Sequence, residues 1–250
     1  MIEFQGLNRV YGDFTAVHPL TLTVDRGEVF GFLGPNGAGK TTTIRMMMGI
    51  LVPSGGRALI QGLDCHTQRA EVQRHVGYLP DNPIYYDFLR GREILRFVGE
   101  MHGMSRGDAE KRAVDMLGEF GLTEVVDEFA VNYSMGMKKK LGLACALIHD
   151  PQVLILDEPI NGLDPRAARD VQDRLRHAAA AGKTIFMSTH LLDMAEKVCT
   201  RVGIIHKGGL VATGTLAELR ERVSDNASLE EVFLRVTDEG AEQAAAPATL

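Results

Sequence analysis

The chain has 250 residues, of which 45% are hydrophobic and 24% are charged, and its formal net charge is −6. This is ordinary globular composition with ample material for a core, and it shows no basic footprint for nucleic acid. No apolar run approaches the roughly 20 residues that span a bilayer, and residues 1–5 lack the basic start of a signal peptide. The three widely spaced cysteines suit reduced thiols in the cytosol. Any membrane role is therefore expected to need a separate membrane-spanning partner.

The first 80 residues are predicted to alternate between strands and helices. Strands are expected at 2–10, 20–24, 29–33, 57–60 and 76–79, and helices at about 42–51 and 67–75. The first of these helices stops before Pro53-Ser54-Gly55-Gly56, which is a turn signal.

Residues 81–148 differ, because apolar spacing predicts three helices, at 92–101, 108–120 and 134–148. We interpret this region as a helical lobe inserted between strands. The apolar run 153–156 is typical of a strand buried on both faces. Further strands are expected at 184–188 and 202–205, and helices at 165–181, 191–198, 215–223 and 228–236. This alternation predicts an α/β fold with a parallel sheet, followed by a disordered, Ala-rich tail over 237–250.

One stretch carries the strongest chemical signal. It matches the pattern G-x-x-x-x-G-K-[ST] and lies between a predicted strand and a helix, which is the context of a phosphate-binding loop. Its glycines let backbone N–H groups face an anion, and the helix start adds unpaired N–H groups. Lys40 can reach the β- and γ-phosphates, and the Thr41 hydroxyl can ligate Mg²⁺. The predicted nucleotide-binding residues here are Gly34, Pro35, Asn36, Gly37, Ala38, Gly39, Lys40, Thr41 and Thr42.

A second motif places two carboxylates at the end of the apolar run 153–156. Ligands bind at the C-terminal ends of strands in open α/β sheets. Asp157 suits a water-mediated Mg²⁺ contact, and Glu158 can accept a proton from the water that attacks the γ-phosphate. An acidic strand-to-loop turn is the alternative.

With a third motif, Tyr133-Ser134-Met135-Gly136-Met137, the chain resembles the nucleotide-binding subunit of an ATP-binding-cassette (ABC) transporter over residues 2–236. The usual family signature is Leu-Ser-Gly-Gly-Gln, so Met135 and Met137 depart from it. The resemblance implies that Ser134, Met135 and Gly136 meet the γ-phosphate held by a second subunit. Read locally, Ser134 is also a helix N-cap.

The resemblance implies a P-loop NTPase (RecA-like) fold, with a parallel-sheet core, an antiparallel β-subdomain and an inserted α-helical lobe. The core lobe would cover 1–80 and 150–215, the helical lobe about 82–148, and the C-terminal helices 215–236.

Further positions acquire roles from the resemblance. His190, directly after a predicted strand, would contact the γ-phosphate and orient Glu158 and water. Asp164, in Asn161-Gly162-Leu163-Asp164, would help couple two nucleotide sites, and it can at the same time be part of a turn and an N-cap, since it precedes Pro165. Tyr11 would stack on adenine, with a core or surface tyrosine as the alternative.

Asp81 departs from the family pattern, which commonly has glutamine there. A carboxylate can also serve a Mg²⁺ shell through water. We interpret the aromatic segment 82–89 as a groove for a partner's helix or as lobe core. We interpret the lysines 138–140 as a solvated helix face, with a set of ligand-binding residues as the alternative.

The implied function is a Mg²⁺-dependent ATPase subunit that powers export through a separate membrane permease, with ATP-driven closure of two ATPase chains. The metal residues would be Thr41, Asp81 and Asp157, and the catalytic residues Lys40, Glu158 and His190. The segment 228–234 resembles the ending of exporter subunits. The protein is expected on the cytoplasmic face of the membrane, bound through the permease and not to nucleic acid. A soluble relative that acts in DNA repair or translation and a binding module that does not hydrolyse ATP are the alternatives.

Overall fold

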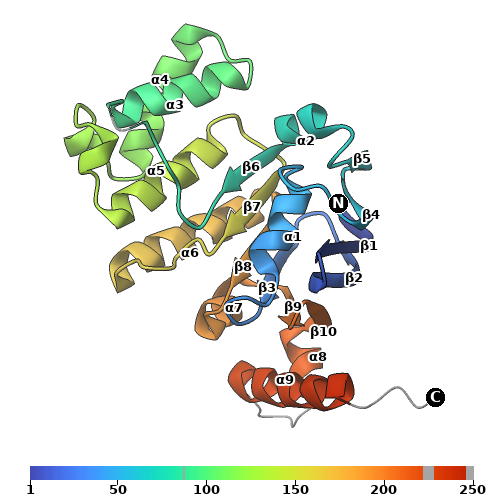
Figure 1. Ribbon diagram of the computed structural model, residues 1–250. Helices are drawn as coiled ribbons and strands as arrows, with labels where there is room; N and C mark the ends of the chain where they lie inside the picture. Colours follow the sequence, from blue (N-terminus) through green and yellow to red (C-terminus); the bar gives the residue numbers. More distant parts are fainter. Residues whose placement is uncertain (87, 222–227, 246–250) are drawn as a thin grey trace. The chain divides into compact units, whose positions relative to one another are not determined.

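The computed structural model describes residues 1–86, 88–221 and 228–245, with side chains described up to residue 237 (Figure 1). The chain forms two compact units, one of Met1–Val72 with Phe186–Leu250 and one of Gln73–Ile185. It passes between them within helix α2 (Arg69–His75) and strand β8 (Thr184–Thr189).

The first unit contains an antiparallel sheet with the strand order β2-β1-β4-β5. Its strands are β1 (Ile2–Tyr11), β2 (Phe14–Val24), β4 (Gly55–Ile60) and β5 (Leu63–Asp64), and the β1–β2 hairpin is the blue pair in Figure 1. On β1 the apolar side chains of Ile2, Phe4 and Leu7 are all buried. The strand expected at residues 2–10 is therefore confirmed, and these apolar residues face the core.

The same unit holds strand β3 (Val29–Leu33), which pairs in parallel with β9 (Arg201–His206). All five β3 residues are buried, and Phe30 and Phe32 lie 5.6 and 5.5 Å from the Phe186 ring. The phosphate-loop sequence follows β3 and leads into α1 (Lys40–Met47), and α7 (Leu192–Val198) follows β8.

The sequence did not predict strand β10 (Gly209–Thr215), which pairs antiparallel with β9. The turn between them is Lys207-Gly208, with φ values of 45° and 80°. Two residues with positive φ form the type I′ turn that joins the strands of a tight hairpin. The glycine at position 208 was the feature of the sequence that could have predicted this hairpin turn.

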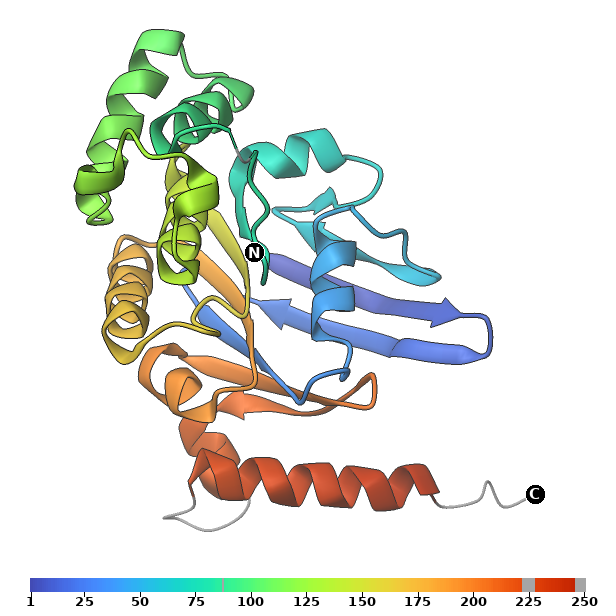
Figure 2. The same ribbon diagram turned by 60° about the vertical axis from the view of Figure 1, so that its left-hand side comes forward.

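Two helices end the described chain, α8 (Leu216–Glu221) and α9 (Leu229–Ala245), and both pack on β10 (Figure 2). The sequence predicted the last helix to end near residue 236 and a disordered tail from 237. The helix instead continues to Ala245, since the alanines and glutamates of this stretch are good helix formers. The predicted helix over 222–223 and the end of the tail, 246–250, lie outside the described residues.

The second unit contains β6 (Val76–Leu79), paired in parallel with β7 (Val153–Asp157). Its helices are α3 (Gly91–Met101), α4 (Arg106–Glu119), α5 (Met135–Leu147) and α6 (Pro165–Ala180), with 3₁₀ turns at Thr123–Val125 and Ala130–Asn132. The three helices expected over 81–148 are confirmed within two residues at each end. Whether they form a lobe of their own stays a prediction.

Helix α5 packs closely on β6 because Gly77 has no side chain. A Cβ atom at Gly77 would lie 1.9 Å from the Ala146 carbonyl oxygen and 2.9 Å from a Leu154 methyl carbon. The structure thus combines strands paired in parallel with an antiparallel sheet, as the predicted α/β class requires.

We expect Gly77→Ala to lower the free energy of unfolding by about 1–3 kcal/mol, because the added methyl group meets backbone atoms that cannot rotate away. Urea denaturation followed by circular dichroism measures this. The matched control is Gly107→Ala in α4, where a Cβ atom meets nothing within 4 Å, and we expect it to be neutral or slightly stabilising. Equal stability of the two variants would contradict the close packing of α5 on β6.

Candidate functional site

The phosphate loop in the first unit is held by backbone contacts from neighbouring strand ends. The Gly34 N–H donates to the Thr189 carbonyl at 3.3 Å, and the Gly208 N–H donates to the Ala38 carbonyl at 3.1 Å. A Cβ atom at Gly34 would lie 2.4 Å from the Ile205 carbonyl oxygen, so only glycine permits this approach. The end of β8 and the β9–β10 hairpin therefore fix the loop on both sides.

Lys40 lies inside this loop at the first residue of α1. It is 6% exposed, and its Nζ donates to the carbonyls of Gly34 at 2.6 Å and Pro35 at 3.2 Å. The preceding Gly39 has φ 105°, a backbone conformation that favours glycine. Pro35, Asn36, Gly37 and Thr41 are exposed, and Thr42 is half-buried. The loop thus offers a buried ammonium, exposed backbone and a hydroxyl at a helix N-terminus, which suits a polyphosphate.

Tyr11 lies at the end of β1 and is 45% exposed, so a core tyrosine is excluded. The Arg9 guanidinium lies over its ring, 4.4 Å from the ring centre. Phe14, paired with Tyr11 across the hairpin and also exposed, is an aromatic candidate that the sequence analysis missed. Its position three residues after Tyr11 could have identified it as a second candidate for stacking on adenine. Whether either ring stacks on adenine stays a prediction.

His190 follows β8 and is half-buried. With residues of α7 and the start of α9 it lines a hollow of about 330 Å³. Glu196 in α7 accepts from Arg220 at 2.8 Å and from the Leu229 N–H at 3.0 Å, which ties both terminal helices to α7. The structure therefore brings the phosphate loop and His190 together in the first unit, with β8 ending beside the loop.

In the second unit, Asp157 ends β7 and Glu158 follows it, and both side chains are buried. Glu158 has φ 47°, a left-handed conformation that costs a non-glycine residue about 1–2 kcal/mol. Its carbonyl oxygen accepts from the Asn161 N–H at 3.2 Å and from the Lys139 Nζ at 2.7 Å. Strained backbone at a carboxylate that follows a strand is typical of a functional site.

The interpretation of the lysines 138–140 as a solvated face was wrong for Lys139. This side chain is 3% exposed, and its Nζ lies 3.4 Å from the Asp81 Oδ1. It lies on the buried stripe of α5 with Gly142, Leu143 and Ala146, and this helical spacing was the signal. Lys140, one position on, pairs instead with Asp170 at 3.1 Å.

Burial lowers the pKa of Lys139 from its ordinary value, and the carboxylate of Asp81 opposes that shift more than Asp157 or Glu158 does. The other oxygen of Asp81 accepts from the Asn82 side chain at 3.1 Å. Both carboxylate oxygens of Asp81 thus have partners within the chain, which disfavours direct coordination of a metal ion by this residue.

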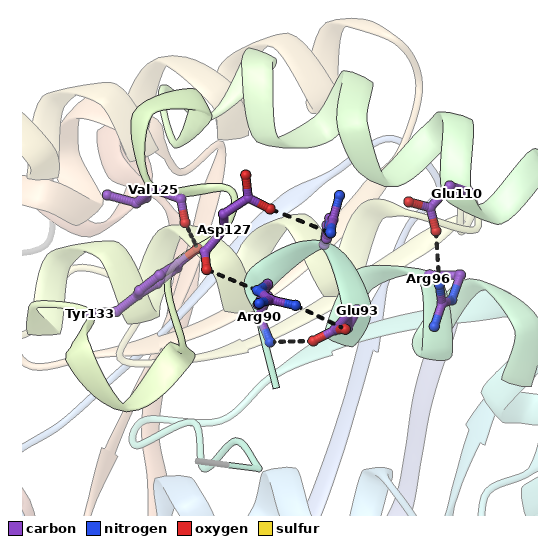
Figure 3. Close-up of polar contacts among 8 residues, drawn as sticks. Arg90, Glu93, Arg96, Glu110, Val125, Asp127 and Tyr133 are labelled. Carbon is purple, nitrogen blue, oxygen red and sulfur yellow. Dashed lines mark hydrogen bonds and ion pairs between the residues drawn. The ribbon is translucent and has the colours of Figure 1, made fainter. Parts of the chain in front are cut away.

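The signature segment opens α5 with Ser134 as N-cap, whose Oγ accepts from the Met137 N–H at 3.3 Å. Tyr133 before it is buried, and its hydroxyl donates to the Val125 carbonyl at 2.9 Å (Figure 3). Burial raises the pKa of Tyr133. The same view shows Arg90 donating to the Asp127 carbonyl, at 2.9 Å, and so joining α3 to the residues before Tyr133. The position that precedes Ser134 is therefore firmly anchored.

Met135, which replaces a glycine of the usual signature, is exposed and lies against Gly162. Asp164, two residues later, caps α6, because its Oδ1 accepts from the N–H groups of Arg166 and Ala167 at 2.9 Å. These bonds, that of Ala167 first, lower the pKa of Asp164. The predicted N-cap is confirmed, and the structure brings the signature into contact with the loop 161–164.

The aromatic segment after Asp81 is not lobe core. Ile84, Tyr86 and Phe88 are 93%, 70% and 83% exposed. Tyr85 is anchored by its hydroxyl, which donates to the Lys138 carbonyl at 2.7 Å. An apolar groove of about 600 Å³ is lined by Tyr85, Tyr86, Phe88, Leu89 and Phe97.

Comparison with known proteins identifies relatives. The family model described as ABC transporter matches residues 17–161. The chain is 36% identical over 241 residues to the probable multidrug ABC transporter ATP-binding protein YbhF of Escherichia coli (strain K12), covering 94% of this chain and 41% of YbhF. It is 38% identical over 225 residues to the daunorubicin/doxorubicin resistance ATP-binding protein DrrA of Streptomyces peucetius, covering 90% of this chain and 68% of DrrA. The chain thus spans about two fifths of YbhF.

A solved structure of an ATP-binding subunit of an ABC transporter matches with a TM-score of 0.88 and 34% identity, over 95% of this chain and 99% of that one. A dimeric ATP-binding cassette bound to ADP and phosphate matches with a TM-score of 0.80 at 20% identity, which shows the fold alone. The predicted P-loop NTPase fold class is confirmed.

We expect Lys40→Ala to weaken ATP binding by about 10- to 100-fold, because it removes charge-assisted hydrogen bonds worth about 1.5–3 kcal/mol. A fluorescent-nucleotide titration measures this. Lys111→Ala, which removes an exposed lysine on α4, is the control and should bind as the unmodified chain does. Unchanged affinity of Lys40→Ala would contradict the assignment of the loop.

Proposed function

This chain belongs to the ABC transporter family as one of its ATP-binding subunits, and from that premise we propose that it hydrolyses ATP to power export across a membrane. The observation that carries the proposal is the phosphate loop, in which backbone contacts hold a buried Lys40 at the start of α1. A loop so constrained is preorganised for a triphosphate, and it need not reorganise when the anion arrives.

We assign the chemical step to residues at strand ends. Glu158 takes a proton from the attacking water, and His190 orients that water. Lys40 holds the β- and γ-phosphates, and the first residues of α1 add backbone N–H groups that offset the charge developing on the γ-phosphate. Tyr11 binds the adenine ring by stacking.

The residues also fit a magnesium ion. The donors Thr41 and Asp157 are a hydroxyl and a carboxylate, the hard oxygen ligands that Mg²⁺ prefers, and they would hold it beside the phosphates. When bound, the ion would offset phosphate charge. Asp81 enters this set only through water, because both of its oxygens already have partners in the structure.

A second copy of the chain completes the site in this proposal. Each chain contains one signature, in which Ser134 and Gly136 match the family pattern, and one phosphate loop at 34–41. Two chains would therefore form two complete sites. Ser134 and the N–H groups of the first turn of α5 suit an anion, and Met135 in this turn lies against Gly162, in the loop that ends at Asp164. Closure of the dimer would exclude water and supply donors to the γ-phosphate.

The partner that receives the work is proposed to be a separate permease, which would hold this subunit on the cytoplasmic face. Within the described parts of the chain, helices are too short or too polar to cross a bilayer. The groove beside Tyr86 and Phe88 suits an apolar helix of the permease, because large exposed aromatic side chains are typical of interface anchors. Export is favoured because DrrA is a resistance protein for daunorubicin and doxorubicin.

We expect Glu158→Gln to lower ATP turnover by at least about 100-fold while ATP affinity stays within about threefold, since the amide cannot accept the proton. Phosphate release and nucleotide titration measure the two quantities. Glu124→Gln, an exposed glutamate in a 3₁₀ turn, is the control and should keep full turnover. Unchanged turnover in Glu158→Gln would refute the role of base. A dimer fraction that does not rise with ATP in sedimentation would refute ATP-driven closure.

We expect Tyr86→Asp combined with Phe88→Asp to reduce binding to native membranes at least about tenfold, because each removes an aromatic anchor and places a charge in an apolar interface. Co-sedimentation with membranes of the source organism measures this. Val114→Asp alters an exposed apolar residue of α4 and should bind normally. Equal binding of both variants would exclude the groove as the docking surface.

A further inference from the structure

We propose that Lys139 is a positioning residue for ATP hydrolysis, which links Asp81 to the backbone of Glu158. The inference rests on the proposed role of Glu158 as the base. It assigns a function to a lysine outside the phosphate loop, and it explains why a carboxylate occupies position 81.

Lys139 contacts the backbone of Glu158 directly. The Lys139 Nζ is buried and donates to the Glu158 carbonyl at 2.7 Å. Glu158 has left-handed backbone, so its peptide orientation is held by its neighbours and not by intrinsic preference. Lys139 and the Asn161 N–H are two such neighbours, since both donate to the same oxygen. A shift of Lys139 would therefore turn the peptide that carries the base.

The charge of Lys139 is compensated by neighbouring carboxylates. A buried ammonium is stable only when nearby acceptors and an opposite charge compensate the lost water. Asp81 provides a carboxylate oxygen at 3.4 Å, and Asp157 and Glu158 are the other acidic groups that favour the charged form. Glutamine at position 81 would be neutral and would provide no such compensation. The carboxylate of Asp81 and the ammonium of Lys139 thus form a matched pair.

Asp81 lies next to the segment that forms the proposed docking groove. It lies two residues after the end of β6 and precedes the exposed apolar residues Ile84, Tyr86 and Phe88. The Tyr85 hydroxyl donates to the backbone carbonyl of Lys138. A partner that displaces this segment would act on Lys139 through both the Asp81 ion pair and the Tyr85 bond. From Lys139 one hydrogen bond leads to Glu158. Three contacts therefore connect the proposed docking groove with the proposed base.

Lys140 offers a matched control, because it has the same charge on the same helix and also an acidic partner. Its Nζ lies 3.1 Å from the Asp170 Oδ2, and it is 20% exposed. A general effect of removing a lysine from α5 would appear in both Lys139→Met and Lys140→Met. A positioning effect would appear only in Lys139→Met.

The experiment measures kcat and KM for Mg-ATP, ATP affinity and Tm on the full chain and its variants. We expect Lys139→Met to lower kcat at least about tenfold with ATP affinity within about threefold, and Lys139→Arg to restore part of the loss. Lys139→Met leaves the carboxylate of Asp81, which is 33% exposed, partly in water, whereas Asp81→Asn removes the carboxylate nearest a buried ammonium. Asp81→Asn should thus lower Tm more than Lys139→Met does, but kcat less.

The double variant Asp81→Asn, Lys139→Met should be no slower than Lys139→Met alone, because Asp81 acts through Lys139. Additive losses in kcat would overturn the proposal. So would a kcat of Lys139→Met equal to that of Lys140→Met, or losses that follow Tm across the series. If Lys139→Met does not fold, the kcat of Lys139→Arg and Asp81→Asn decides the question, and full kcat in both overturns the proposal.

Glu158→Gln, measured in parallel, separates the two claims. If Glu158→Gln keeps its turnover, the proposed base is wrong, and the inference fails with it. If Glu158→Gln is inactive while Lys139→Met keeps full kcat, only the role of Lys139 is wrong.

Discussion

A buried ammonium must find acceptors to replace its water, and the local structure around the site residues within each unit depends on this constraint. Among the described residues, the two buried lysines are Lys40 and Lys139, and each follows a glycine-containing motif at the start of a helix. Each donates to a backbone carbonyl, that of Gly34 in one unit and that of Glu158 in the other. In both places the lysine adds a side-chain hydrogen bond to a segment that backbone hydrogen bonds also hold.

The two cases differ in what surrounds the charge. Lys40 is bound by two carbonyls of its own loop, in a setting of exposed backbone that suits an incoming anion. Lys139 has a carboxylate partner in Asp81, so its charge is already balanced within the chain. The first arrangement is suited to binding a ligand, and the second to keeping Glu158 in an uncommon conformation.

Sequence patterns predicted the helices and strands that bear the phosphate loop, the signature and the pair Asp157 and Glu158, because apolar periodicity and glycine spacing are local. They also predicted the N-caps at Ser134 and Asp164, which depend only on the next three residues. The sequence patterns did not predict β10, and they predicted the last helix to end near residue 236, whereas α9 continues to Ala245. They misjudged Lys139, because three adjacent lysines resemble a solvated face, although the helical spacing of Lys139 to Gly142, Leu143 and Ala146 places it on the buried stripe of α5. The roles of the single residues in nucleotide chemistry remain predictions, because they depend on groups outside this chain.

The ion pair between Lys139 and Asp81 also constrains how this sequence can evolve. The two positions lie 58 residues apart in the chain, yet a neutral residue at position 81 leaves the buried ammonium of Lys139 without its nearest carboxylate. A single replacement at position 81 would pass through a less stable intermediate, whereas a paired exchange for neutral side chains would not. The two positions are therefore coupled, and an uncharged residue at position 139 is the match for a neutral residue at position 81.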